Sequence, residues 1–151
     1  MMTIGDIVRY SNGCLLKGDA QKSIIHISTD TRTLTKGSLF VALRGKNFDG
    51  HKFIKEALRK GASAVLVSKK VAVATKSAAV IQVADTLKAY GDLASYHRMR
   101  FSIPVVAITG SVGKTTTKEL IGSVLMERFN ILKNYQTENN EIGVTKTVLG
   151  L

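Results

Sequence analysis

A short stretch at residues 108–119, ITGSVGKTTTKE, limits the possible folds of this chain more than any other segment. It has the residues of a phosphate-binding loop, in which glycines let backbone N–H groups point at phosphate oxygens. Lys114 adds a positive charge near the terminal phosphates, and the Thr115 hydroxyl is suited to Mg²⁺. The common loop reads G-x-x-x-x-G-K-[ST], but Ile108 stands here where the first glycine is expected. The sequence therefore predicts a shortened variant of this loop.

The sequence on both sides of the loop supports this prediction. VVAIT at 105–109 is a β-branched run that predicts a buried parallel strand, and TTTKELIGSVLMERF at 115–129 has the apolar spacing of a helix. A helix that begins at the loop places its positive dipole end at the phosphates. We therefore expect nucleotide phosphate to bind here. The predicted phosphate-binding residues are Thr109, Gly110, Ser111, Val112, Gly113, Lys114, Thr115 and Thr116.

The rest of the chain alternates between strand and helix patterns. Short apolar runs predict strands at 23–28, 38–43, 64–67 and 79–83, and helical spacing predicts helices at 3–13, 52–61 and 85–100. Thr3 and Asp85 are suited to cap the first and last of these helices, and Gly61 to end the middle one. This alternation predicts an α/β fold.

Composition excludes several classes of protein. Of the 151 residues, 44% are hydrophobic and 22% are charged, which is typical of globular domains. No apolar run approaches the roughly 18–20 residues of a membrane span, and the N-terminus lacks the features of a secretory signal. The single cysteine, Cys14, cannot form an internal disulfide. These features predict a cytoplasmic protein.

Positive charge is concentrated in the first hundred residues. They hold 17 of the 22 Lys and Arg residues but 7 of the 11 Asp and Glu residues. Such a field attracts anions, either nucleic acid or a phosphorylated small molecule, although the chain has no arginine-rich run or aromatic stacking pattern. The change in charge predicts two domains, 1–100 and 101–151. Because the second holds too few elements for a complete sheet, we expect the chain to be a fragment.

Four segments resemble the Mur ligase family, which builds the peptide stem of peptidoglycan. TGSVGKTTTKE is similar to the family's ATP loop, T-G-[ST]-x-G-K-[ST]-[ST], which also lacks the first glycine. DTRTLTKGSLFVALRGKNFDGHKFIKEALRKGASAVLV resembles the signature of the amino-terminal domain in the MurE and MurF types. ADTLKAYGDLASYHR with the loop, and NNEIGVTKTVLGL after it, are more similar to MurF. The chain departs from that type at Gln136, Thr137 and Thr145, where Gly, Asn and Pro are usual.

The resemblance implies a function and an architecture. It implies an ATP-dependent amide ligase that uses ATP and Mg²⁺ to join D-Ala-D-Ala to UDP-N-acetylmuramoyl-tripeptide through an acyl phosphate. It also implies a small N-terminal α/β UDP-binding domain followed by the first strand, phosphate loop and helix of a central ATPase domain. We expect a monomer that binds no nucleic acid, and a fragment that is inactive alone. Two alternatives remain open: a MurE-type ligase that adds a diamino acid, and a basic nucleic-acid-binding module.

The resemblance also assigns roles to individual residues. Lys114 and Thr115 are the implied catalytic residues, with Thr115 as the metal ligand. The implied UDP-binding residues are Asp30, Thr31, Arg32, Gly45, Lys46, Asn47 and His51, and those near the muramoyl-peptide are Asn139 and Asn140. Structural roles remain possible for several of these: residues 30 and 31 as turn caps, Arg32 in an ion pair and His51 as a helix cap. We expect His26 and His97 to be packing residues.

Overall fold

The computed structural model describes residues 1–45, 48–71, 77–134 and 140–151. The chain divides into two compact units, Met1–Leu93 and Ala94–Leu151, and each is described by itself. The division falls within helix α3 (Thr86–Met99), ahead of residue 100. The boundary at residue 100 therefore stays a prediction. Among the described residues, no helix is both long enough and apolar enough to cross a membrane.

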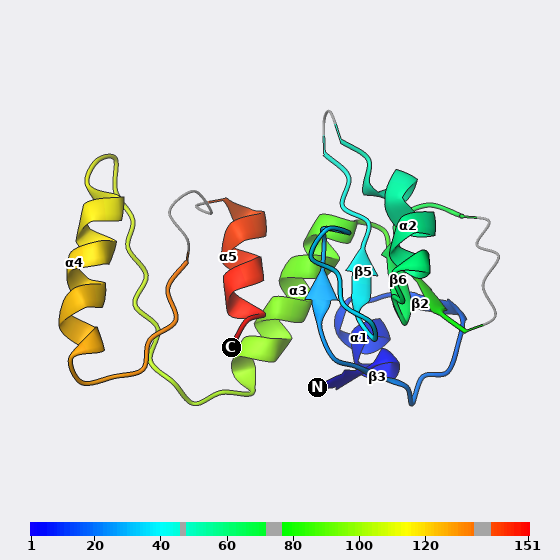
Figure 1. Cartoon of the computed structure of the whole chain (residues 1–151), viewed down its shortest axis with the longest axis horizontal. Helices are drawn as coiled ribbons and strands as arrows, with labels where there is room; N and C mark the ends of the chain where they lie inside the picture. Colours follow the sequence, from blue (N-terminus) through cyan, green and yellow to red (C-terminus); the bar gives the residue numbers. More distant parts are fainter. Residues whose placement is uncertain (46–47, 72–76, 135–139) are drawn as a thin grey trace. The chain divides into compact units, whose positions relative to one another are not determined.

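The first unit is built on a five-stranded sheet with the order β2-β7-β6-β5-β4 (Figure 1). Its parallel strands are β4 (Ile27–Ser28), β5 (Leu39–Val41), β6 (Ala64–Val67) and β7 (Ala79–Gln82), and β2 (Cys14–Lys17) runs antiparallel to β7. A second, two-stranded sheet pairs β1 (Met2–Thr3) with β3 (Ser23–Ile24). The predicted α/β fold is confirmed, and four of the five strands of the larger sheet are parallel.

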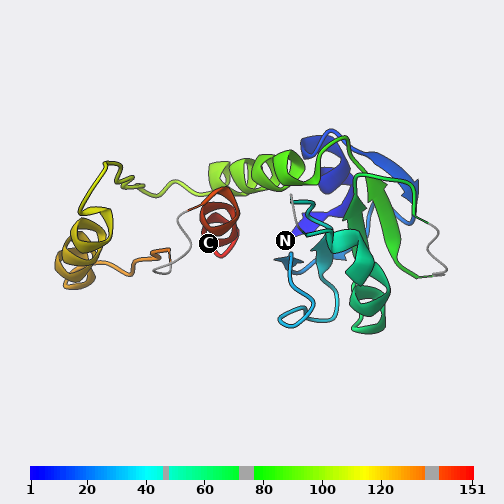
Figure 2. The ribbon, with the colours of Figure 1, turned by 90° about the horizontal axis from the view of Figure 1, so that it is seen from above.

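Helices cover both faces of the five-stranded sheet (Figure 2). Helix α2 (Ile54–Arg59) packs on the face that carries Phe40, Val65 and Val80, which the strand register places side by side. Helix α1 (Ile4–Tyr10) and the start of α3 lie over the other face (Figure 2). Successive side chains of a strand point to opposite faces of the sheet, and here both faces are covered by helices. Every residue of β5 and β6 is therefore buried, which explains why both strands are continuous apolar runs.

Local sequence explains where these helices begin. Thr3 accepts a hydrogen bond from the backbone N–H of Asp6, and the Asp6 side chain accepts one from Thr3, which forms a complete capping box on α1. The Asp85 carboxylate accepts hydrogen bonds from the N–H groups of Leu87 and Lys88 at the start of α3. The 3₁₀ helix η1 (Gly50–Phe53) precedes α2. The three predicted helices are therefore confirmed.

One strand prediction in the first unit needs correction. The segment 23–28 is not one strand, because β3 pairs with β1 whereas β4 pairs with β5 in the other sheet. Between them, Ile25 and His26 are exposed, so His26 is not a packing residue. Strands β1 and β2 were not predicted. Each forms through pairing with a strand distant in sequence, which a short local pattern does not reveal.

The second unit contains helices α4 (Lys114–Met126) and α5 (Glu141–Val148), and α4 confirms the helix expected after the loop. The predicted buried strand at 105–109 is wrong for this structure: Val105 and Val106 are 66% and 61% exposed. A β-strand is stabilised by hydrogen bonds to a neighbouring strand, and the described part of this unit holds no strand that could pair with it. Helix α5 was not predicted.

Candidate functional site

The carboxyl ends of three adjacent parallel strands form one candidate site. Strands β4, β5 and β6 are neighbours in the sheet and run in the same direction, so their carboxyl ends lie at one edge. Residues 30–32 follow β4, Gly45 and His51 follow β5, and Ser68 follows β6. Open parallel sheets bind ligands at this edge. The structure therefore brings the described members of the predicted UDP-binding set to one edge of the sheet.

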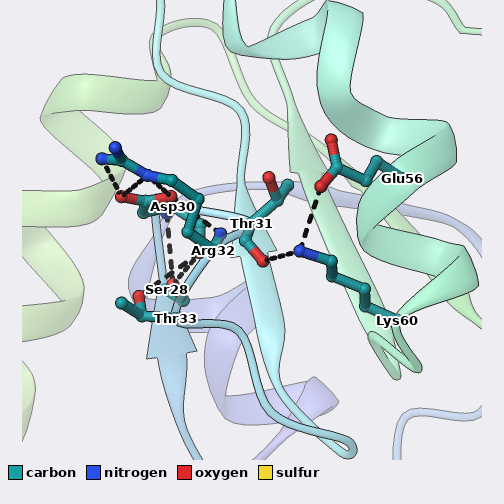
Figure 3. A network of polar contacts seen from close by, with 7 residues as sticks. All are labelled: Ser28, Asp30, Thr31, Arg32, Thr33, Glu56 and Lys60. Carbon is teal, nitrogen blue, oxygen red and sulfur yellow. Dashed lines mark hydrogen bonds and ion pairs between the residues drawn. The ribbon is translucent and has the colours of Figure 1, made fainter.

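The turn after β4 is held by its own polar groups (Figure 3). Ser28 Oγ donates to the backbone oxygen of Asp30 at 3.0 Å and accepts from the Asp30 N–H at 3.2 Å. The Arg32 guanidinium pairs with the Asp30 carboxylate, with an Nη2–Oδ2 distance of 2.6 Å, and these hydrogen bonds lower the pKa of Asp30. The Arg32 side chain remains 86% exposed. The turn thus has a defined shape and presents a guanidinium to solvent.

Helix α2 holds the same turn from the other side (Figure 3). The Lys60 ammonium donates to the backbone oxygen of the buried Thr31 at 2.8 Å and lies 3.1 Å from Glu56 Oε1. Hydrogen bonds from Lys60, and then from the Thr31 side chain, lower the pKa of Glu56. Because Thr31 is buried and its backbone oxygen is bonded to Lys60, its position is fixed by packing as well as by turn geometry.

The turn after β5 contains Gly45 and leads to His51. The Gly45 N–H donates to the backbone oxygen of Phe48 at 2.8 Å, and Arg44 forms a β-bridge with Asp49. The His51 ring is buried, and both of its nitrogens lie within hydrogen-bond distance of protein atoms. Lys46 and Asn47, also predicted to bind UDP, lie outside the described residues.

The phosphate loop lies in the second unit, where Gly110 and Gly113 have φ angles of 150° and 81°. Such angles favour glycine, which explains the two glycines of the motif. Gly113 is the N-cap of α4 and offers no side chain to the first N–H groups of the helix, which suits them to an anion. Lys114 Nζ donates to the Gly110 carbonyl oxygen at 2.5 Å. All eight predicted residues, 109–116, are exposed.

Residues near α5 and possible metal ligands complete the predicted set. Asn140 is the N-cap of α5, where its Oδ1 accepts from the Gly143 N–H at 2.9 Å, and Asn139 lies outside the described residues. His97 is partly buried, and its ring contacts Phe101 edge-on, in line with a packing role. Within the described ranges, no group of three or more His, Cys, Asp or Glu side chains could hold a metal ion. The Thr115 hydroxyl is nevertheless the kind of oxygen that Mg²⁺ accepts alongside phosphates.

Three residues that hold the turns of the candidate site escaped sequence reasoning: Lys60, Ser68 and Lys69. Lys60 bonds to Thr31, and Lys69 Nζ lies 2.7 Å from Asp49 Oδ2. Their partners are 17 to 29 positions away in the chain. The parallel strand register brings Ser68 and Lys69 to theirs, whereas Lys60 reaches Thr31 from the end of α2. No local pattern in the sequence marks them.

Known proteins resemble this chain along its whole length. Residues 23–98 match the Mur ligase family, catalytic domain, and residues 108–151 match the Mur ligase middle domain. A UDP-N-acetylmuramoyl-tripeptide–D-alanyl-D-alanine ligase of Synechocystis sp. is 47% identical over 153 residues, covering 99% of this chain and 34% of the relative. The chain thus spans about a third of that relative.

Solved structures of MurF ligases are also similar to this chain. A MurF crystal structure from Acinetobacter baumannii is 34% identical, with a TM-score of 0.90 over 99% of this chain and 33% of its own. A MurF ligase from Thermotoga maritima in complex with ADP is 35% identical, with a TM-score of 0.73 over 82% of this chain and 28% of its own. The matched segments include both the sheet-edge residues and the phosphate loop, and this chain belongs to the Mur ligase family.

Proposed function

We propose that this chain forms the nucleotide-binding part of an ATP-dependent ligase that joins D-Ala-D-Ala to UDP-N-acetylmuramoyl-tripeptide. One observation carries the proposal: a relative named for this activity matches 99% of the chain at 47% identity. The exposed phosphate loop at the start of α4 supports it, and so does the binding of ADP by a similar MurF ligase. Because the chain spans a third of these relatives, the activity is proposed for the whole protein.

In this proposal the phosphate loop acts on ATP. The N–H groups at the start of α4 and the Lys114 ammonium would stabilise negative charge on the transferred phosphoryl group. Thr115 would contribute its hydroxyl oxygen to Mg²⁺, which neutralises phosphate charge when bound. A substrate carboxylate attacks the γ-phosphorus, ADP leaves, and an acyl phosphate forms. The dipeptide amine then attacks the acyl carbon, phosphate leaves, and the amine loses a proton.

The edge of the parallel sheet would bind the UDP part of the second substrate. The residues proposed to form this site are Asp30, Thr31, Arg32, Gly45, Lys46, Asn47 and His51, with Asn139 and Asn140 near the muramoyl-peptide. The exposed Arg32 guanidinium and the basic charge of the first hundred residues suit a diphosphate. We further propose that the protein is monomeric and cytoplasmic and binds no nucleic acid.

Calorimetric titration with MgATP tests the proposed ATP site, and titration with UDP-N-acetylmuramoyl-tripeptide tests the proposed UDP site. Lys114→Ala should weaken MgATP binding by about tenfold or more, because a charged hydrogen bond to phosphate is lost. It should leave the affinity for the UDP ligand unchanged. Lys146→Ala, on α5 and outside the loop, is the matched control. If the unaltered chain bound neither ligand at millimolar concentration, or if Lys114→Ala bound MgATP normally, the proposal would be wrong.

A further inference from the structure

Asp49, His51 and Ser68 form a continuous series of hydrogen bonds between two turns of the first unit. His51 Nδ1 lies 2.6 Å from Asp49 Oδ1, and His51 Nε2 lies 3.0 Å from the backbone nitrogen of Ser68. The His51 side chain is only 3% exposed, so water cannot replace these partners. The series joins the turn after β5 to the turn after β6, both at the carboxyl edge of the sheet.

The geometry determines where the ring proton lies. A backbone N–H can only donate, so His51 Nε2 must accept and carries no proton. The proton is therefore on Nδ1, which donates to the Asp49 carboxylate. Ser68 Oγ is 3.5 Å from Nε2, too far for a good hydrogen bond. Although Asp, His and Ser occur together, the ring thus holds a backbone amide and does not activate the serine hydroxyl.

The Asp49 carboxylate accepts two further hydrogen bonds. Its Oδ2 pairs with Lys69 Nζ at 2.7 Å, and its Oδ1 also accepts from the His51 N–H at 3.1 Å. Hydrogen bonds from Lys69, and then from His51, hold the pKa of Asp49 well below its usual range. The bridge between Asp49 and Arg44 continues into the turn that contains Gly45. Asp49 therefore connects three features: its backbone pairs with Arg44 in the β5 turn, and its carboxylate binds the His51 ring and a lysine of the β6 turn.

We propose that Asp49 and His51 are positioning residues for the UDP-binding edge, and that His51 does not contact the ligand. They fix the backbone around Gly45 and hold the Lys69 ammonium at the same edge of the sheet. Both His51 ring nitrogens are already bonded within the protein, so the ring has no free polar atom for uridine. This inference rests on the proposed UDP site, and it changes how His51 serves that site.

Three substitutions in the intact chain test the inference, with UDP as the titrated ligand. His51→Phe fills the ring's space but bonds to neither partner, and we expect it to weaken UDP binding by about tenfold. His51→Gln can still accept from the Ser68 N–H and should recover part of that affinity. Ser68→Ala keeps the backbone N–H and should bind UDP like the unaltered chain. A role in packing alone predicts normal affinity for His51→Phe.

Amide hydrogen exchange in the absence of UDP provides a second measurement. The amide of residue 68 should be less protected from exchange in His51→Phe than in the unaltered chain. In Ser68→Ala its protection, relative to the intrinsic rate of an alanine amide, should be unchanged. Asp49→Asn is a second variant in case His51→Phe does not fold; it loses the ion pair with Lys69 and should also weaken UDP binding. Normal UDP affinity in folded His51→Phe, or unchanged Ser68 exchange, would overturn the inference. Absence of UDP binding by the unaltered chain would instead overturn the nucleotide site itself, and the positioning role with it.

Discussion

Gly50 offers the sharpest test of how the sheet edge is packed. A Cβ atom added there would lie 2.7 Å from the Leu43 carbonyl oxygen, 2.9 Å from the Leu43 nitrogen and 3.0 Å from the Ala42 carbonyl carbon. All three are backbone atoms of the buried segment that follows β5. Unlike the end of a flexible side chain, this backbone cannot move aside without disturbing the sheet. We therefore predict that Gly50→Ala destabilises the first unit.

The size of the effect follows from two contributions. Overpacking a well-packed site costs about 1–3 kcal/mol. Any shift that relieves the contact also lengthens the 2.8 Å hydrogen bond from the Gly50 N–H to the Leu43 oxygen, which costs about 1 kcal/mol more. The free energy of unfolding should therefore fall by about 2–4 kcal/mol.

Gly91 provides a matched control for the same chemical change. It lies inside helix α3, and a Cβ added there would meet no atom within 4 Å. Replacing glycine by alanine inside a helix stabilises it by about 0.5–1 kcal/mol, so Gly91→Ala should have the opposite sign. Amide exchange of the β6 residues Val65 and Leu66 measures the opening of the central sheet directly. The reasoning is refuted if Gly50→Ala leaves their exchange unchanged, or if Gly91→Ala destabilises as much.

Two further predictions concern local polar groups of the first unit. Thr3→Ala removes the capping box of α1 and should lower the free energy of unfolding in urea by about 1 kcal/mol, whereas Thr3→Ser should not; equal losses would exclude the cap as the cause. The pKa values of Asp30, Asp49 and Glu56 are all lowered by their cationic partners. The folded protein therefore binds these protons less well than the unfolded chain. The resulting stabilisation is complete above the ordinary carboxyl pKa of about 4 and is lost as the pH falls from there through the lowered values. Urea unfolding at pH 7 and pH 3 should show this loss, and Asp49→Asn should reduce it; an unchanged pH dependence in that variant would count against the ion pair with Lys69.

Local patterns predicted much of the fold because their causes are local. The Thr3 and Asp85 caps act within one helical turn, and they were identified correctly. The segment 23–28 was misread because its two halves pair with strands in different sheets. The segment 105–109 has the composition of a buried strand, yet composition alone does not supply a neighbouring strand. Both errors have the same cause: a segment forms a strand only where a neighbouring strand pairs with it, and the local sequence does not show which strand that is.

In the candidate site, too, the sequence predicted the local features, and the tertiary structure decided those that depend on distant partners. The sequence determined the phosphate loop, because its glycines, lysine and threonine lie within a few consecutive residues of the chain, and it also carried the family signature. It suggested that Arg32 could be in an ion pair, which forms with Asp30 two residues away. Only the tertiary structure decided the partners of His51, Thr31 and Asp49. Ser68 and Lys69, the partners of His51 and Asp49, follow β6, and the parallel register that aligns the strand ends brings them within hydrogen-bond distance. Lys60 reaches Thr31 from the end of helix α2.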